Sequence, residues 1–140
     1  MDLVARLREA ACRELERSPV RLAYLFGSVA TGLARGGSDV DVAVVLEPSL
    51  PTERYVELSL ELARRLSTAS GEGGIEVVVL NDAPLPLLGR AVRERIVLFS
   101  RDEPFRVRFE GKVLKEFFDF QIHAEPMDRE LLRATAEGRR

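Results

Sequence analysis

Two spacings of apolar residues along the chain predict helices that alternate with strands. Apolar residues three or four positions apart predict helices over residues 3–15, 52–66, 85–95 and 105–122. Short apolar runs that end at Gly, Pro, Asn or Ser predict strands over residues 20–26, 39–46, 75–80 and 96–99. A short helix over 29–34 is expected after the first strand, and 96–99 is expected at a sheet edge. Since no repeat or linker interrupts this order, the sequence predicts one α/β domain.

The last predicted helix has an apolar surface wider than one packing partner requires. Its apolar positions are Phe105, Phe109, Val113, Phe117 and Phe120, with Leu114, Phe118 and Ile122 beside them. We expect a second packing partner, which is either another part of this chain, a second copy or a different protein. We place the domain, with this helix, at residues 1–125. Residues 126–140 are expected to form a C-terminal tail with room for one short helix.

Composition narrows the class of protein. The 140 residues carry 21 basic and 23 acidic side chains, a net charge of -2, and this balance argues against direct nucleic-acid binding through phosphate neutralisation. The longest apolar runs have about five residues, against roughly 20 that a membrane helix needs. The N-terminal segment has no apolar signal core, so we expect a cytoplasmic protein with no membrane contact.

A small turn and two carboxylates stand at the facing ends of the first two strands. Gly27-Ser28 ends the first strand, and Asp39-Val40-Asp41 begins the second. Period two in a strand points Asp39 and Asp41 to the same face, where their charges repel unless a cation lies between them. Hard carboxylate oxygens favour Mg²⁺, which usually takes further ligands from substrate phosphates. Gly27 allows phosphate oxygens to approach the backbone, and Ser28 offers an N–H and a hydroxyl.

A third carboxylate is expected at this site, because a two-metal site needs groups for the attacking and the leaving oxygen. Glu76 is the one acid in the apolar strand 75–80, and it would lie beside the aspartate strand if the two strands pair. These residues predict a site for a nucleoside triphosphate. The alternative is that Asp39 and Asp41 form a solvated strand start and that Glu76 is an exposed edge residue.

These residues resemble the signature of the DNA polymerase beta-like nucleotidyltransferase superfamily, which is Gly-Ser, an Asp-x-Asp on the next strand and a third acid on a later strand. The chain is most similar to its minimal (MNT-domain) members, which include the MntA-type antitoxins. The similarity is strong over residues 24–28 and 38–44 and weaker over 75–81 and 92–99. It implies a small mixed sheet flanked by helices.

The resemblance implies a role for each residue of the motif. Gly27 and Ser28 hold the triphosphate of ATP, Asp39 and Asp41 bind Mg²⁺, and Glu76 completes the acidic set as a metal ligand and helps activate the acceptor. The third acid is commonly Asp in the family, and the Glu found here reaches one methylene further.

The resemblance also implies a reaction and a partner. The expected activity is Mg²⁺-dependent transfer of AMP from ATP to a hydroxyl group of a partner protein, a HEPN-domain toxin of a toxin–antitoxin pair, with release of pyrophosphate. One alternative is an antitoxin of the same fold that acts mainly by binding. The other is a nucleotidyltransferase that modifies a small molecule, which the short chain disfavours. A homo-oligomer and a hetero-oligomer both remain open.

Overall fold

The computed structural model describes residues 1–34 and 39–123. Its helices are α1 (Leu3–Leu15), α2 (Ser28–Thr31), α3 (Tyr55–Ser70), α4 (Leu85–Glu94) and α5 (Glu103–His123), with a 3-10 turn, η1 (Thr52–Arg54), before α3. The strands are β1 (Val20–Phe26), β2 (Val40–Leu46), β3 (Ile75–Val79) and β4 (Ile96–Ser100). The element order is the predicted one. The short helix expected after Pro126 lies outside the described residues.

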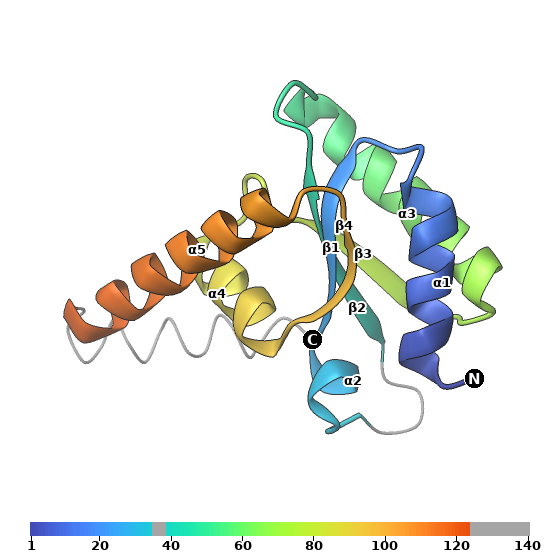
Figure 1. Ribbon diagram of the computed structural model, residues 1–140, viewed down its shortest axis with the longest axis horizontal. Coiled ribbons are helices and arrows are strands. Elements are labelled where there is room, and N and C mark those ends of the chain that lie inside the picture. Colours follow the sequence, from blue (N-terminus) through green and yellow to red (C-terminus); the bar gives the residue numbers. More distant parts are fainter. Residues whose placement is uncertain (35–38, 124–140) are drawn as a thin grey trace.

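The four strands form one mixed sheet in the order β3-β2-β1-β4. Strand β1 runs antiparallel to β2 and to β4, whereas β2 and β3 are parallel. Helices α1 and α3 cover one face of the sheet, α4 and α5 lie on the other, and α2 lies at the end of β1 (Figure 1). The predicted mixed sheet flanked by helices is therefore confirmed, with β4 at an edge.

Successive residues of the strands contribute side chains alternately to two separate hydrophobic cores. On β2, Val42 and Val44 point into the core beneath α1 and α3. Ala43 and Val45 point into the core beneath α4 and α5. This alternation follows from the period of two in a strand, and it explains why the central strands read as continuous apolar runs. Asp41 belongs to the second series, so it lies on the face covered by α4 and α5.

Helices α2 and α3 have boundaries that differ from the prediction by several residues. The segment expected as a helix from Thr52 begins with η1, and the α-helix that follows continues to Ser70 instead of ending at residue 66. It ends where Gly71 takes a left-handed conformation, with φ +79°. Helix α2 is shorter than predicted because Gly32, with φ +80°, ends it by donating its N–H to the carbonyl of Ser28.

Polar side chains fix the ends of several elements. Asp2 accepts a hydrogen bond from the N–H of Ala5 and caps α1, and Asp102 caps α5 in the same way. Beyond β3, the amide of Asn81 accepts from the N–H of Leu46 at 2.8 Å and donates to its carbonyl at 2.9 Å, which extends the contact with β2. Such contacts satisfy backbone groups that the helices and strands leave open.

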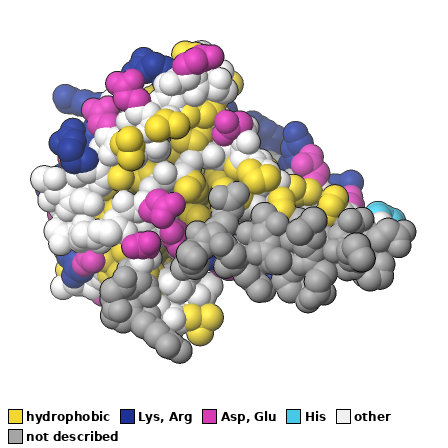
Figure 2. All heavy atoms as spheres, turned by 180° about the vertical axis from the view of Figure 1, so that it is seen from behind, with side chains coloured by type: hydrophobic (Ala, Val, Ile, Leu, Met, Phe, Trp, Pro, Cys, Tyr) yellow, Lys and Arg dark blue, Asp and Glu magenta, His cyan; other side chains and the backbone are white. Residues whose placement is uncertain are grey.

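Helix α5 packs closely on α4 through a glycine. A Cβ added at Gly89 would lie 2.1 Å from the Phe117 ring, so only glycine permits this approach. Val113 and Phe117 are buried, whereas Phe118, Phe120 and Ile122 are exposed. Figure 2 shows apolar side chains at the surface from the body of the molecule onto the arm that ends in the histidine of α5. Helix α5 therefore has two packing partners within the described residues, helix α4 and strand β1, which it contacts through Phe105 and Glu110.

No helix within residues 1–34 and 39–123 is both long enough and apolar enough to cross a membrane.

Candidate active site

Two of the predicted carboxylates lie side by side on one face of the sheet. Asp41 is the direct neighbour of Glu76 across the parallel β2–β3 pair, and of Phe26 across the antiparallel β1–β2 pair. Residues paired in this way point to the same side. Glu76 is exposed, whereas Asp41 is half-buried and its Oδ2 atom is buried. The expectation that Glu76 would lie beside the aspartate strand is confirmed.

Asp39 lies just before β2, against the turn that leads into β3. A Cβ built on Gly74 would lie 3.6 Å from Asp39 Oδ1, and Gly74 itself has a φ of +70°. The carbonyl of Gly74 accepts a hydrogen bond from the N–H of Val40 at 3.0 Å. The Asp39 carboxylate is exposed at the same end of the sheet as Asp41 and Glu76.

The three carboxylates lie at the same end of strands β2 and β3 but do not converge on one point. In the part of the chain that the structure describes, no group of three or more His, Cys, Asp or Glu residues lies close enough to hold a metal ion. Like charges of this kind draw together only when a cation offsets their repulsion. The donor set itself, hard carboxylate oxygens at one strand end, suits Mg²⁺. The metal-binding role of these residues therefore stays a prediction.

The glycine turn at the end of β1 has a conformation that requires glycine. Gly27 has φ +83° and ψ -162°, a region that other residues avoid because of their Cβ atoms. Its carbonyl accepts hydrogen bonds from the N–H and the hydroxyl of Thr31, which closes α2 onto the turn. Because Phe26 neighbours Asp41, this turn and the acidic strand end are adjacent.

Sequence reasoning missed one residue that contacts the turn. The Gly27 N–H donates a hydrogen bond to Glu94 Oε1 at 2.9 Å, although the two residues are 67 positions apart. Glu94 is the last residue of α4, where the helix dipole disfavours a negative charge. The sequence offered one signal for this contact: Glu94 is an acid at the C-terminal end of a predicted helix, where a negative charge is disfavoured.

Arg90 holds the Glu94 carboxylate from one turn earlier on α4. Its Nε atom lies 3.3 Å from Glu94 Oε1, and its guanidinium carbon lies 5.5 Å from the centre of the Phe26 ring. The Arg90 side chain is only 13% exposed, so this pair is less screened by water than a surface ion pair. The glycine turn is thus held by the Arg90–Glu94 ion pair of α4 through the hydrogen bond from Gly27 to Glu94.

A second acidic group, Glu110 of α5, is buried further along the same face. It accepts a hydrogen bond from the Tyr24 hydroxyl at 2.8 Å and forms ion pairs with Arg95 and Arg106 at 3.0 and 3.1 Å. Burial, together with the Glu110 carboxylate, raises the pKa of the Tyr24 hydroxyl well above its usual value. Two hydrogen bonds from Arg106 lower the pKa of Glu103 at the start of α5 to about 2.

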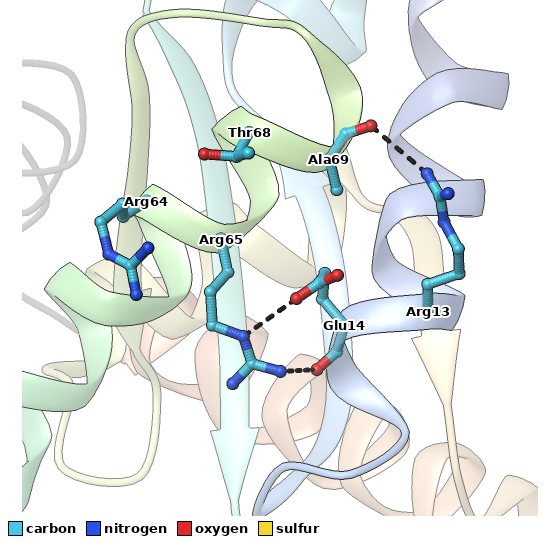
Figure 3. A pocket seen from close by; sticks show the side chains of 6 residues that line it. All are labelled: Arg13, Glu14, Arg64, Arg65, Thr68 and Ala69. Carbon is cyan, nitrogen blue, oxygen red and sulfur yellow. Dashed lines mark hydrogen bonds and ion pairs between the residues drawn. The ribbon is translucent and has the colours of Figure 1, made fainter.

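A hollow of about 390 Å³ opens between α1 and α3, on the opposite face of the sheet. It is lined by Arg13, Glu14, Arg64, Arg65, Thr68 and Ala69, and none of the predicted site residues contributes to it. Figure 3 shows the Arg65 guanidinium turned to Glu14, where it contacts both the carboxylate and the backbone carbonyl. The hollow is therefore separate from the acidic strand end.

A glycine turn at one strand end, two aspartates at the start of the next strand and an acid on the parallel neighbour together define a nucleotidyltransferase type of domain. The chain matches the family described as "Polymerase beta, Nucleotidyltransferase" over residues 12–104. It therefore belongs to this family. No curated protein sequence matches it significantly.

Solved structures of toxin–antitoxin complexes have a similar fold. One is a crystal structure of a toxin-antitoxin with AMP-PNP, with 21% identity, a TM-score of 0.66 and coverage of 92% of this chain and 98% of the other. Another holds a tri-AMPylated HEPN toxin of Shewanella oneidensis in complex with its MNT antitoxin, with 19% identity, a TM-score of 0.65 and the same coverages. At these identities the likeness shows a shared fold.

Proposed function

We propose that this protein is a Mg²⁺-dependent nucleotidyltransferase that moves AMP from ATP to a hydroxyl group of a partner protein, a HEPN-domain toxin. The observation that carries the proposal is the pairing of Asp41 with both Phe26 and Glu76. It sets the acidic strand end beside the Gly27 turn, so a nucleotide held at the turn would have its phosphates next to the carboxylates. Membership of the polymerase beta family supports the same reaction class.

Each predicted residue has a defined task in this proposal. Gly27 and Ser28 would bind the triphosphate, since the Gly27 backbone lacks a Cβ that would keep phosphate oxygens away. Asp39 and Asp41 would hold Mg²⁺, which when bound offsets the negative charge that develops on the phosphates. Glu76 would complete this acidic set as a ligand, and its exposed position would also let it face the acceptor.

The reaction forms one phosphorus–oxygen bond and breaks another. The acceptor hydroxyl oxygen attacks the α-phosphorus of ATP, and the bond from that phosphorus to the bridging oxygen of the β-phosphate breaks. Pyrophosphate leaves with the electron pair of this bond, and the hydroxyl proton passes to a nearby base, for which Glu76 is the candidate. Catalysis of this kind depends on alignment and charge stabilisation more than on covalent chemistry.

The nature of the donor and the acceptor is supported by the similar structures. One of them contains AMP-PNP, an ATP analogue, and another contains a HEPN toxin that carries AMP groups. We therefore favour ATP as the donor and a toxin hydroxyl as the acceptor.

A second candidate is an antitoxin that acts by binding alone. The exposed Phe118, Phe120 and Ile122 on α5 favour it, since exposed apolar groups often mark interfaces. Phe117 is packed against Gly89, so Phe117→Asp would disturb the core and would not test an interface. Phe120→Asp is the suitable variant: loss of partner binding with an unchanged melting temperature would support this surface as the interface.

The proposal is tested with ATP labelled at either end. The purified protein is incubated with Mg²⁺, a lysate of its host and ATP labelled on the α-phosphate or, in a parallel sample, on the γ-phosphate. Nucleotidyl transfer predicts a labelled protein band from the α-label only. A γ-labelled band that forms only when this protein is added, or no added band with either label while Mg²⁺-ATP still binds, would contradict protein nucleotidylation. The Asp39→Asn/Asp41→Asn variant serves as the matched control.

A further inference from the structure

The hydrogen bond between Gly27 and Glu94 joins the end of α4 to the glycine turn. Gly27 is buried, and its N–H points to Glu94 Oε1 at 2.9 Å. A buried N–H that lost this acceptor would pay the full cost of its desolvation. The contact therefore fixes the orientation of the Phe26–Gly27 peptide.

This peptide begins a turn with an uncommon backbone conformation. Gly27 adopts φ +83° and ψ -162°, and glycine has many other accessible conformations because it lacks a Cβ. An external contact is needed to keep one of them populated. On one side of Gly27 the Thr31 N–H and hydroxyl hold its carbonyl, and on the other side Glu94 holds its N–H. Thr31 belongs to the turn itself, so Glu94 is the contact from outside the turn that holds the Gly27 backbone.

A carboxylate at this place has an electrostatic cost. It lies at the C-terminal end of α4 and beside the turn where the proposed function places a triphosphate, so it is disfavoured by the helix dipole and by the phosphates. Arg90 offsets this cost through its contact with the same oxygen, Glu94 Oε1, at 3.3 Å. If this position served only to end a helix, an uncharged residue would avoid the unfavourable electrostatic energy. The presence of a carboxylate therefore indicates a specific role.

We propose that Glu94 is a positioning residue of the nucleotide-binding turn, which acts by holding the Gly27 N–H and thereby the placement of Ser28. Arg90 keeps the carboxylate in place and neutralises it. This inference rests on the proposed function for the role of the turn, whereas the Glu94–Gly27 contact itself can be tested without any activity. It assigns no contact between Glu94 and the substrate.

The kinetic test compares Glu94→Ala with Glu94→Gln. Alanine removes the acceptor, so the KM for ATP is expected to rise by about tenfold, the size of one hydrogen bond to a charged group. The KM for the acceptor protein should stay unchanged. Glutamine keeps an oxygen that can accept from Gly27, so its KM for ATP should stay within about threefold of the wild type. Glu57→Ala, an exposed acid on the opposite face, is the control.

A second measurement reports on the contact directly. In Glu94→Ala the amide proton of Gly27, followed by NMR, should exchange with solvent at least about tenfold faster than in the wild type, and in Glu94→Gln it should remain protected. Unchanged protection in Glu94→Ala would overturn the proposal. Lost protection with an unchanged KM for ATP would overturn it too, because the contact would then not position the nucleotide. Equal losses in the Ala and Gln variants would contradict a hydrogen-bonding role.

Failure of the proposed function would have a different signature. In that case the wild type transfers no label to any acceptor, and Glu94 is judged by the affinity for Mg²⁺-ATP in place of the KM. A weaker affinity in Glu94→Ala together with faster exchange at Gly27 would still support the positioning role. An unchanged affinity would overturn it.

Discussion

The face of the sheet beneath α4 and α5 carries two acidic regions that are built in opposite ways. At one, the Glu110 carboxylate is buried and meets two arginines and a tyrosine hydroxyl. At the other, Asp41 has a second carboxylate, Glu76, as its direct neighbour in the sheet, and Asp39 follows at the same strand end. The first region surrounds one carboxylate with hydrogen-bond donors and positive charge, whereas the second places two carboxylates next to each other in the sheet.

The difference separates a structural role from a chemical one. A buried carboxylate surrounded by donors stabilises the fold only as a complete set, and the loss of one member leaves uncompensated charge. Adjacent carboxylates repel each other unless a cation offsets their charge, which agrees with the proposed metal-binding role of this region. We therefore expect substitutions at the two regions to have opposite effects on stability and on transfer.

The largest effect is expected at the acidic strand end. Asp39→Asn/Asp41→Asn should lower the rate of AMP transfer by about a thousandfold, because the proposed metal ligands are lost. Without Mg²⁺ the free energy of unfolding should stay the same or rise, since repulsion with Glu76 is relieved. Transfer assays and urea unfolding of the same preparations check both parts. If the variant were less stable and still transferred AMP at the normal rate, the acidic strand end would have a structural role and not a chemical one.

The buried region should respond in the opposite sense. Glu110→Ala leaves the Tyr24 hydroxyl and two arginines without their shared acceptor, and it should lower the free energy of unfolding by about 2 to 3 kcal/mol. This value allows for the partial exposure of Arg95 and Arg106. Glu110→Gln keeps a hydrogen-bond acceptor and should lose less. Transfer per folded molecule should remain near the wild-type rate, and a large loss would mean that this region also serves the chemistry.

A substitution in the glycine turn should affect both properties. Gly27→Ala places a Cβ in a conformation that only glycine adopts readily, which should cost about 2 kcal/mol of stability. Relief of this strain would move Ser28, so we also expect weaker binding of ATP. Thermal unfolding and ATP binding are the readouts. An alanine variant with unchanged stability would show that the turn is not held as described, and Gly73→Ala provides a control at a glycine with open space around it.

The smallest effect concerns the exposed end of the Glu110 region. Hydrogen bonds from Arg106 hold the pKa of Glu103 at about 2, against an ordinary value of 4.5. A lowered pKa stabilises the fold above pH 4.5, and this contribution is lost as the pH falls towards 2. Glu103→Gln should therefore lower the melting temperature slightly at pH 7, and the difference should vanish near pH 2. Because the pair is exposed, high salt should weaken the effect.

The sequence predicted the elements because they depend on local patterns, and it placed Glu76 beside the aspartate strand only on the condition that the two strands pair. Alternation in β2 set the face of Asp41, and the placement of Glu76 beside it followed from two neighbouring strands. The site roles of Gly27, Ser28, Asp39, Asp41 and Glu76 remain predictions, as do the domain limits at 125 and 126.

Contacts between distant segments could not be predicted in this way. Glu94 meets Gly27 across 67 residues, and Glu110 meets Tyr24 across 86. The sequence marks both acids as polar positions on helices, and only the packing of α4 and α5 on the sheet shows that they are partly or fully enclosed. The boundary of α3 was missed because Gly71, not the last apolar residue, ends the helix.

The most direct test of the account is the mass of the acceptor protein. The protein that becomes labelled in the host lysate is purified and incubated with this enzyme, Mg²⁺ and ATP, and its intact mass and modified residue are determined by mass spectrometry. The account predicts the gain of one or more whole AMP groups on a side-chain hydroxyl, and no gain with Asp39→Asn/Asp41→Asn. An unchanged mass, or the same gain with the double variant, would contradict transfer by the acidic strand end.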